Sequence, residues 1–127
     1  MNEMGAVRVL LVEDEGLIRL ITEEFLQEHG FEVIEAWNGD EAARLLDGPD
    51  GFDVLFTDVR MPGSLDGVAL AEHARRRYPK LPVLMVSGYA ENLVSRLRGL
   101  DPPMVVMGKP YDLLAVIDTL RHLTVGS

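Results

Sequence analysis

Short apolar runs alternate five times with longer amphipathic segments along this 127-residue chain, and this alternation restricts the possible folds more than any other feature. The apolar runs have the length and the β-branched character of buried strands. They lie at residues 7–12, 31–36, 54–58, 83–86 and 104–107. Strands that alternate with helices form a parallel sheet with helices on both faces, because the crossover connections are right-handed. The pattern predicts one doubly wound α/β domain over residues 1–127, with its core between residues 7 and 123.

The amphipathic segments carry apolar residues at helical spacing, so each is predicted to be a helix. The predicted helices lie at residues 17–29, 42–46, 67–77, 90–100 and 111–123. The second helix is expected to be capped near Gly39 or Asp40, and Asp66 is the expected N-cap of the third. Gly30 marks the end of the first. The chain shows no linker, repeat or low-complexity stretch that would divide it.

Composition excludes several classes of protein. The formal net charge of −9 argues against binding to a nucleic-acid backbone, which requires a basic face. The chain has no cysteine, which excludes a disulfide framework, a thiol nucleophile and a thiolate metal site. It has neither a signal sequence at its start nor an apolar run of the ~20 residues that a membrane span needs. These features predict a cytoplasmic protein without a membrane partner.

Reactive or ionic side chains stand at the ends of four of the five predicted strands. They are Glu13 and Asp14, Asp58, Ser87 and Lys109. The strand that ends in Asp58 is apolar without alternation, as expected for a strand covered on both faces. The carboxyl ends of parallel strands meet at one edge of a sheet, where ligands bind in open α/β folds. We therefore expect these side chains to converge.

Three carboxylates in one pocket repel each other unless a hard cation such as Mg²⁺ lies among them. A lysine and a hydroxyl opposite them would suit phosphoryl oxygens, and an aspartate can itself be phosphorylated. Each residue taken alone has a plainer interpretation. The acidic run 13–15 could favour a helix N-terminus, Asp58 could be a turn or cap residue, and Lys109 could be solvated. The shared position at strand ends favours the phosphoryl site.

Several short motifs occur together in a specific order, and in that order the chain resembles the receiver domain of two-component response regulators. The motifs are Glu13-Asp14, Asp58-x-x-Met61-Pro62, Asp66-Gly67, Ser87-Gly88 and Lys109-Pro110. The resemblance covers residues 7–123 and implies a flavodoxin-like sheet of order 2-1-3-4-5 with five helices. It also implies a cis peptide bond before Pro110, although the trans form is the usual state of an X-Pro bond.

The resemblance further implies a role for each site residue. Asp58 would accept the phosphoryl group, Ser87 would hydrogen-bond to it, and Lys109 would pair with it. Mg²⁺ would be the cofactor. Its ligands would be Glu13, Asp14, Asp58 and the backbone carbonyl of Arg60.

The family accepts its phosphoryl group from a phosphohistidine on a sensor histidine kinase or a histidine phosphotransfer domain. The resemblance therefore implies a signalling module that catalyses only its own phosphotransfer and slow autodephosphorylation. It would be a monomer or a weak phosphorylation-dependent dimer. It would act either as a stand-alone receiver or as part of a longer regulator or hybrid kinase, with an output partner that the sequence does not name.

Two departures from the family pattern affect the expected output. One residue more than the common spacing separates Asp58 from Asp66-Gly67, so the loop 62–65 should bulge. Val106 stands where the family usually has an aromatic switch residue, and a β-branched side chain has few rotamers to exchange. Tyr89 and Tyr111 are the nearby aromatic residues. We therefore expect the response to phosphorylation in residues 88–100.

Two other classes of protein share some of these features. A phosphatase with an aspartyl nucleophile of the haloacid-dehalogenase type would have a second aspartate two residues after Asp58, but Arg60 stands there. A flavodoxin-like flavin-binding protein would have a Ser/Thr/Gly-rich phosphate loop after its first strand. The acidic residues Glu13, Asp14 and Glu15 would repel that phosphate.

Overall fold

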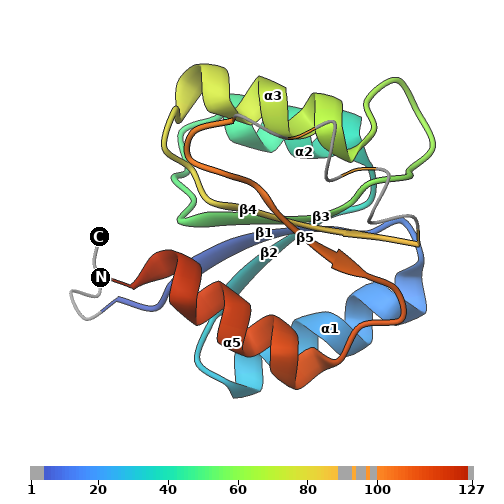
Figure 1. The fold of residues 1–127 in the computed structure, drawn as a ribbon, viewed down its shortest axis with the longest axis vertical. Helices are drawn as coiled ribbons and strands as arrows, with labels where there is room; N and C mark the ends of the chain where they lie inside the picture. The colour runs from blue at the N-terminus through green and yellow to red at the C-terminus, as the bar shows by residue number, and fades with distance from the viewer. Residues whose placement is uncertain (1–4, 89–92, 94–96, 98–99, 126–127) are drawn as a thin grey trace.

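The computed structural model describes residues 5–88, 93, 97 and 100–125 and contains one parallel five-stranded sheet (Figure 1). Its strands are β1 (Arg8–Val12), β2 (Glu32–Ala36), β3 (Val54–Asp58), β4 (Val83–Ser87) and β5 (Val105–Gly108). They pair in parallel in the order β2-β1-β3-β4-β5. The predicted fold class and strand order are confirmed.

Helices cover both faces of the sheet, α2 and α3 on one side and α1 and α5 on the other (Figure 1). The helices of the described part of the chain are α1 (Gly16–Glu28), α2 (Gly39–Asp47), α3 (Gly67–Arg77) and α5 (Leu113–Thr124). The helix expected at residues 90–100 falls mostly on residues outside the described part. None of the described helices has the length and the apolar character of a membrane span.

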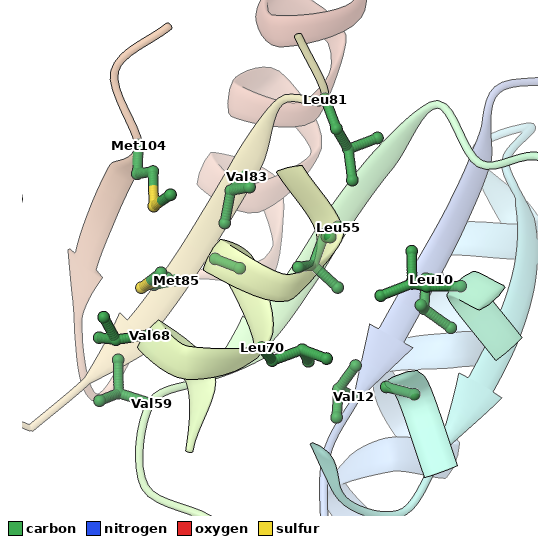
Figure 2. Packing of buried hydrophobic residues seen from close by; sticks show 14 of the residues in the cluster. Leu10, Val12, Leu55, Val59, Val68, Leu70, Leu81, Val83, Met85 and Met104 are labelled. Carbon is green, nitrogen blue, oxygen red and sulfur yellow. The ribbon is translucent and has the colours of Figure 1, made fainter. Parts of the chain in front are cut away.

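The central strands β3 and β4 are buried along their whole length, because helices lie on both faces. Alternate side chains of β3 contribute to the two cores. Leu55 packs with α2 and α3, whereas Val54 and Phe56 pack with α5. Figure 2 shows the first of these cores, in which Leu70 of α3 lies over side chains of the sheet. Two-sided burial explains why the sequence of this strand shows no alternation.

Three of the described helices begin directly after a residue whose side chain caps them, and this residue is not always where the apolar pattern begins. The Asp66 carboxylate accepts the N–H of Ala69 at 2.9 Å, so the predicted cap of α3 is confirmed. The cap of α2 is Asn38, one residue before the predicted Gly39, and its side chain accepts the N–H of Glu41 at 2.8 Å. Asp112 caps α5, which delays that helix to Leu113 although apolar spacing begins earlier.

Helix α1 forms as predicted, but several of its apolar residues face solvent instead of the core. Four large side chains of its first half are exposed to solvent, by 70%, 38%, 49% and 49% respectively: Leu17, Ile18, Leu20 and Ile21. Only Thr22 and Leu26 of this helix are fully buried. Helical spacing correctly predicted the helix, but the apolar residues of its first half do not all face the core.

The long loop between β3 and α3 contacts the start of α2. The Ser64 side chain donates to the Asp40 carboxylate at 2.5 Å, and Gly63 adopts a positive φ of 103° beside the same carboxylate. Gly39 lies directly against the Leu65 carbonyl, where any side chain would clash. The extra residue of this loop is thus accommodated by contacts with α2.

Candidate functional site

Four strand ends and the loops that follow them bring the predicted residues to one edge of the sheet. Asp58 ends β3 and lies beside Val86 of β4, and Ser87 ends β4 beside Gly108 of β5. Asp58, Ser87 and Glu13 are all buried, each 4–5% exposed. A buried polar group requires compensating partners, so three of them at one edge indicate a built site.

Lys109 approaches Asp58 from the β5 side. Its Nζ lies 2.6 Å from Asp58 Oδ2, across 51 positions of the sequence. The backbone N–H of Lys109 donates to the Ser87 carbonyl at 2.9 Å, which anchors the residue to the end of β4. The peptide bond between Lys109 and Pro110 is cis, as predicted, and a second cis peptide bond precedes Pro102.

The acidic residues approach Asp58 from the β1 side. Carboxylate oxygens of Glu13, Asp14 and Asp58 all lie within 4.8 Å of one another. Glu13 also accepts the N–H of Glu15 at 3.0 Å, whereas Asp14 is exposed to solvent. Three oxygen ligands at this spacing match the preference of Mg²⁺ for hard carboxylate donors.

The electrostatics of the site follow from burial and from this mixture of charges. Burial raises the pKa of Glu13, and the neighbouring carboxylates of Asp58 and Asp14 raise it further. Burial opposes the charge of Lys109. Its hydrogen bond to Asp58, with the attraction of Asp58 and Glu13, outweighs burial and raises the pKa of Lys109. The site therefore holds a charged lysine against the Asp58 carboxylate. We call the group formed by Glu13, Asp14 and Asp58 the acidic pocket.

Close backbone packing holds the end of β3. Gly67, the first residue of α3, lies directly against the carbonyl of Asp58, and its N–H donates to the Val59 carbonyl at 2.7 Å. The Thr57 hydroxyl donates to the Asp58 carbonyl at 2.8 Å. These contacts leave no room for a side chain at position 67. They explain in physical terms why a glycine follows the cap residue Asp66.

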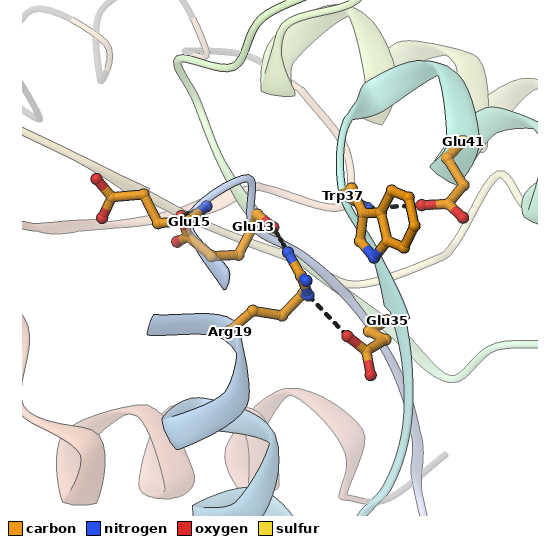
Figure 3. Close-up of polar contacts among 6 residues, drawn as sticks. All are labelled: Glu13, Glu15, Arg19, Glu35, Trp37 and Glu41. Carbon is orange, nitrogen blue, oxygen red and sulfur yellow. Dashed lines mark hydrogen bonds and ion pairs between the residues drawn. The ribbon is translucent and has the colours of Figure 1, made fainter. Parts of the chain in front are cut away.

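Sequence reasoning did not identify two residues beside the acidic pocket, Arg19 and Glu35. The Arg19 guanidinium donates to the Glu13 carbonyl at 2.8 Å and to the Glu35 carboxylate at 2.6 Å (Figure 3). The acidic residue of the pair lies on β2, the strand whose end carries no reactive group. The only available signal was an arginine one turn after Glu15 on the predicted helix.

The departure at Val106 leaves Tyr111 as the described aromatic residue nearest to the lysine. Val106 is half-buried in the core beside α3. The Tyr111 ring is half-buried on the opposite face, in an edge-on arrangement with Phe56 in which the two ring centres lie 6.1 Å apart. Tyr89 lies outside the described residues, and so does most of the segment 88–100 in which the response is expected.

An apolar pocket of about 510 Å³ adjoins the site on the α1 side. Glu13 and Lys109 form its inner wall, and Ile18, Ile21 and Pro110 line the rest, together with other residues of α1 and α5. The phosphoryl-site candidates therefore border directly on exposed apolar surface.

Comparison with known proteins agrees with this geometry. A family model described as the response regulator receiver domain matches residues 9–118. The sensor kinase CckA of Brucella abortus is 34% identical over 94% of this chain, which spans only 13% of the kinase. The response regulator receiver protein CpdR of the same organism is 28% identical over 94% of this chain and 98% of CpdR.

Solved structures give the same result. A response regulator receiver protein from Sinorhizobium medicae is 28% identical, covers 98% of both chains and superposes with a TM-score of 0.88. The response regulator TrrA of Thermotoga maritima, solved in complex with Mg²⁺-BeF, is 26% identical over 92% of this chain and 98% of TrrA, with a TM-score of 0.76. Neither the phosphatase nor the flavodoxin-like alternative is favoured by these matches.

Proposed function

This chain belongs to the response regulator receiver domain family, and on that premise we propose that Asp58 is its phosphoacceptor. It is a signalling module of two-component systems rather than an enzyme with an external substrate. The observation that carries the proposal is the contact of 2.6 Å between Lys109 Nζ and Asp58 Oδ2, opposite the carboxylates of Glu13 and Asp14. A carboxylate between a lysine and an acidic pocket is placed for phosphoryl transfer.

Because Lys109 contacts Oδ2, the other oxygen of Asp58, Oδ1, is the proposed nucleophile. The bond from Oδ1 to phosphorus forms as the phosphorus–nitrogen bond of the donor phosphohistidine breaks. The imidazole leaves with the electron pair of that bond and takes up a proton. Lys109 and Ser87 then hold the oxygens of the transferred group. Attack of water on the acyl phosphate later returns Asp58 to its free form as phosphate leaves.

The proposed cation ligands are Glu13, Asp14, Asp58 and the backbone carbonyl of Arg60. Their oxygens are the hard donors that Mg²⁺ prefers, and carboxylate oxygens of the three side chains lie within 4.8 Å of one another. When bound, Mg²⁺ supplies positive charge that neutralises the phosphoryl oxygens during transfer. The Mg²⁺ complex of TrrA supports this assignment for a chain of the same fold.

The proposed donor is the phosphohistidine of a histidine kinase or phosphotransfer domain, and it docks on α1. Leu17, Ile18, Leu20 and Ile21 expose apolar surface next to the pocket that Lys109 and Glu13 border. A donor whose histidine must reach Asp58 has to cover this edge, and an apolar helical surface would match it. Residues 1–127 would serve as one receiver domain with its core at 7–123, monomeric or weakly dimeric when phosphorylated.

Intact mass spectrometry tests the phosphoacceptor. Incubation with acetyl phosphate and Mg²⁺ should add one phosphoryl group to the parent protein and none to Asp58→Asn. Asp50→Asn is a matched control, because Asp50 is exposed in the loop before β3, at the opposite end of that strand from Asp58. Labelling of Asp58→Asn at the rate of the parent would contradict the proposal.

Donor docking needs a separate test. The double variant Leu17→Ser and Ile21→Ser should accept phosphate from acetyl phosphate at the rate of the parent. It should accept phosphate at least several-fold more slowly from a phosphorylated histidine kinase that labels the parent. Equal slowing with both donors would place the defect in the site rather than in docking.

A further inference from the structure

Arg19, like Lys109, forms an ion pair beside the acidic pocket. Its side chain is 16% exposed and extends from α1 between the ends of β1 and β2 (Figure 3). Nη1 donates to the backbone carbonyl of Glu13 at 2.8 Å, and Nε donates to Glu35 Oε1 at 2.6 Å. One guanidinium therefore joins the main chain of a site residue to a carboxylate on the edge strand.

The bonded carbonyl belongs to the peptide unit that connects Glu13 and Asp14. A peptide unit is planar, so the direction of this carbonyl also sets the direction in which Asp14 begins. On its other side, the N–H of Glu13 donates to the Ala36 carbonyl at 3.1 Å. Glu13 is thus held by hydrogen bonds at both of its backbone groups.

Asp14 is exposed to solvent, and within the described part of the chain its side chain forms no hydrogen bond or ion pair. Its place near Glu13 and Asp58 depends mainly on the backbone that carries it. The peptide unit held by Arg19 is the part of that backbone nearest to its side chain. Loss of the Arg19 hydrogen bond would let the two carboxylates separate.

The surroundings of Arg19 hold its guanidinium plane in this position. Cζ lies 5.8 Å from the ring centre of Trp37, which packs beside Glu35 at the end of β2 (Figure 3). A guanidinium presents several donors in a rigid fork, whereas a lysine ammonium is a point charge on a flexible stem. Because Glu35 balances its charge, the geometric contribution of Arg19 exceeds its electrostatic one.

We propose that Arg19 is a positioning residue for the divalent-cation site, which aligns Glu13 and Asp14 by holding the peptide unit between them. The proposal rests on the assignment of these two residues as cation ligands. It does not require that Asp58 be phosphorylated. Partners that orient metal ligands typically contribute about 10–100-fold to metal affinity.

Direct titration of the metal-free protein with Mn²⁺, followed by the electron paramagnetic resonance of free Mn²⁺, tests this role without any phosphodonor. Arg19→Gln should raise the Mn²⁺ dissociation constant about tenfold. Arg19→Lys, which keeps the charge and most of the packing, should raise it by a smaller factor. At saturating Mg²⁺, labelling of Arg19→Gln by acetyl phosphate should return to within about twofold of the parent, because only cation binding is impaired.

Arg121→Gln is the matched control. Arg121 also donates to a backbone carbonyl, that of His29, and its guanidinium also lies over an aromatic ring, that of Phe31. It is remote from the acidic pocket, so its loss should leave the Mn²⁺ dissociation constant unchanged. An unchanged constant in Arg19→Gln, or an equal rise in both variants, would overturn the proposal. If Asp14→Asn also left Mn²⁺ binding intact, the cation site itself would be wrongly assigned.

Discussion

Two ion pairs lie at the acidic pocket. They have the same length, but the less exposed partner is the carboxylate in one and the cation in the other. Lys109 and Asp58 lie 2.6 Å apart, with side chains 36% and 7% exposed. Arg19 and Glu35 also lie 2.6 Å apart, with side chains 16% and 39% exposed. In the first pair the carboxylate is buried and the cation reaches solvent, whereas in the second the cation is the less exposed partner and the carboxylate reaches solvent.

This difference separates a reactive pair from a structural one. A buried carboxylate with an accessible lysine can exchange its partner, because an ammonium on a flexible stem can follow a newly attached phosphoryl group. The Arg19 guanidinium, which donates to both a carbonyl and a carboxylate, cannot move without losing both hydrogen bonds. Equal distances therefore do not imply equal roles, and burial of the two partners distinguishes them.

The largest expected effect comes from removing the cation of the reactive pair. Lys109→Met should lower the rate of Asp58 phosphorylation by acetyl phosphate about 10²–10³-fold at saturating Mg²⁺, because charge in the transition state loses a stabilising partner. Stopped-flow or quench-flow labelling measures the rate. Lys80→Met, an exposed lysine after α3, is the control. A loss that excess Mg²⁺ restores would place Lys109 with Arg19 as a residue of cation binding.

The next effect concerns Asp14, the exposed carboxylate grouped with Glu13 and Asp58. Mg²⁺ at a hundredfold excess over its dissociation constant should stabilise the parent by about 2.7 kcal/mol. Asp14→Asn should lose most of this gain and should stabilise the metal-free protein, since one of three crowded charges is removed. Thermal unfolding with and without Mg²⁺ measures both changes. Glu15→Gln, the adjacent exposed carboxylate, should respond to Mg²⁺ like the parent.

A third variant shifts the backbone of Asp58, a member of the reactive pair, and leaves the Arg19–Glu35 pair unchanged. Gly67→Ala places a methyl group against the Asp58 carbonyl and the Val59 Cα. We expect a loss of about 1–3 kcal/mol in the free energy of unfolding, as for other overpacked sites, together with slower phosphorylation. Gly51→Ala is the control because nothing lies within 4 Å of its added carbon. Denaturant unfolding would contradict the expectation if both variants were equally stable.

The smallest effect concerns Glu23 of α1, which shares Glu35 with Arg19. Burial and the adjacent Glu35 raise the pKa of Glu23 above its ordinary value of 4.5. A raised pKa means that its contribution to stability is fully present below about pH 4.5 and is lost as pH rises through the folded-state pKa. Glu23→Gln should therefore be slightly more stable than the parent at pH 7 and equal to it near pH 4. Unfolding of both proteins across this range checks the sign. Glu24→Gln, which replaces the exposed next residue, is the control.

The sequence by itself determined the fold class, the five strands and the residues at their ends. Val54, Leu55 and Phe56 of β3 form an uninterrupted apolar run, and Asp66 directly precedes α3, so both features can be read from neighbouring positions of the chain. Such short-range patterns are readable because they repeat with the periods of strands and helices. The errors were also local. Asn38 and Asp112 cap their helices one or two residues away from the expected starts.

Only the tertiary structure decided how the strand ends meet. The contact of Lys109 with Asp58 and the contact of Arg19 with the Glu13 carbonyl join different elements, and their distances depend on sheet register and helix packing. The exposure of Leu17 and Ile21 likewise depends on how the first half of α1 lies relative to the sheet. Periodicity shows that a residue lies on a face or at an end, but not which atom of another element lies opposite. For this reason Asp58 could be identified from its sequence position, whereas Arg19 could not.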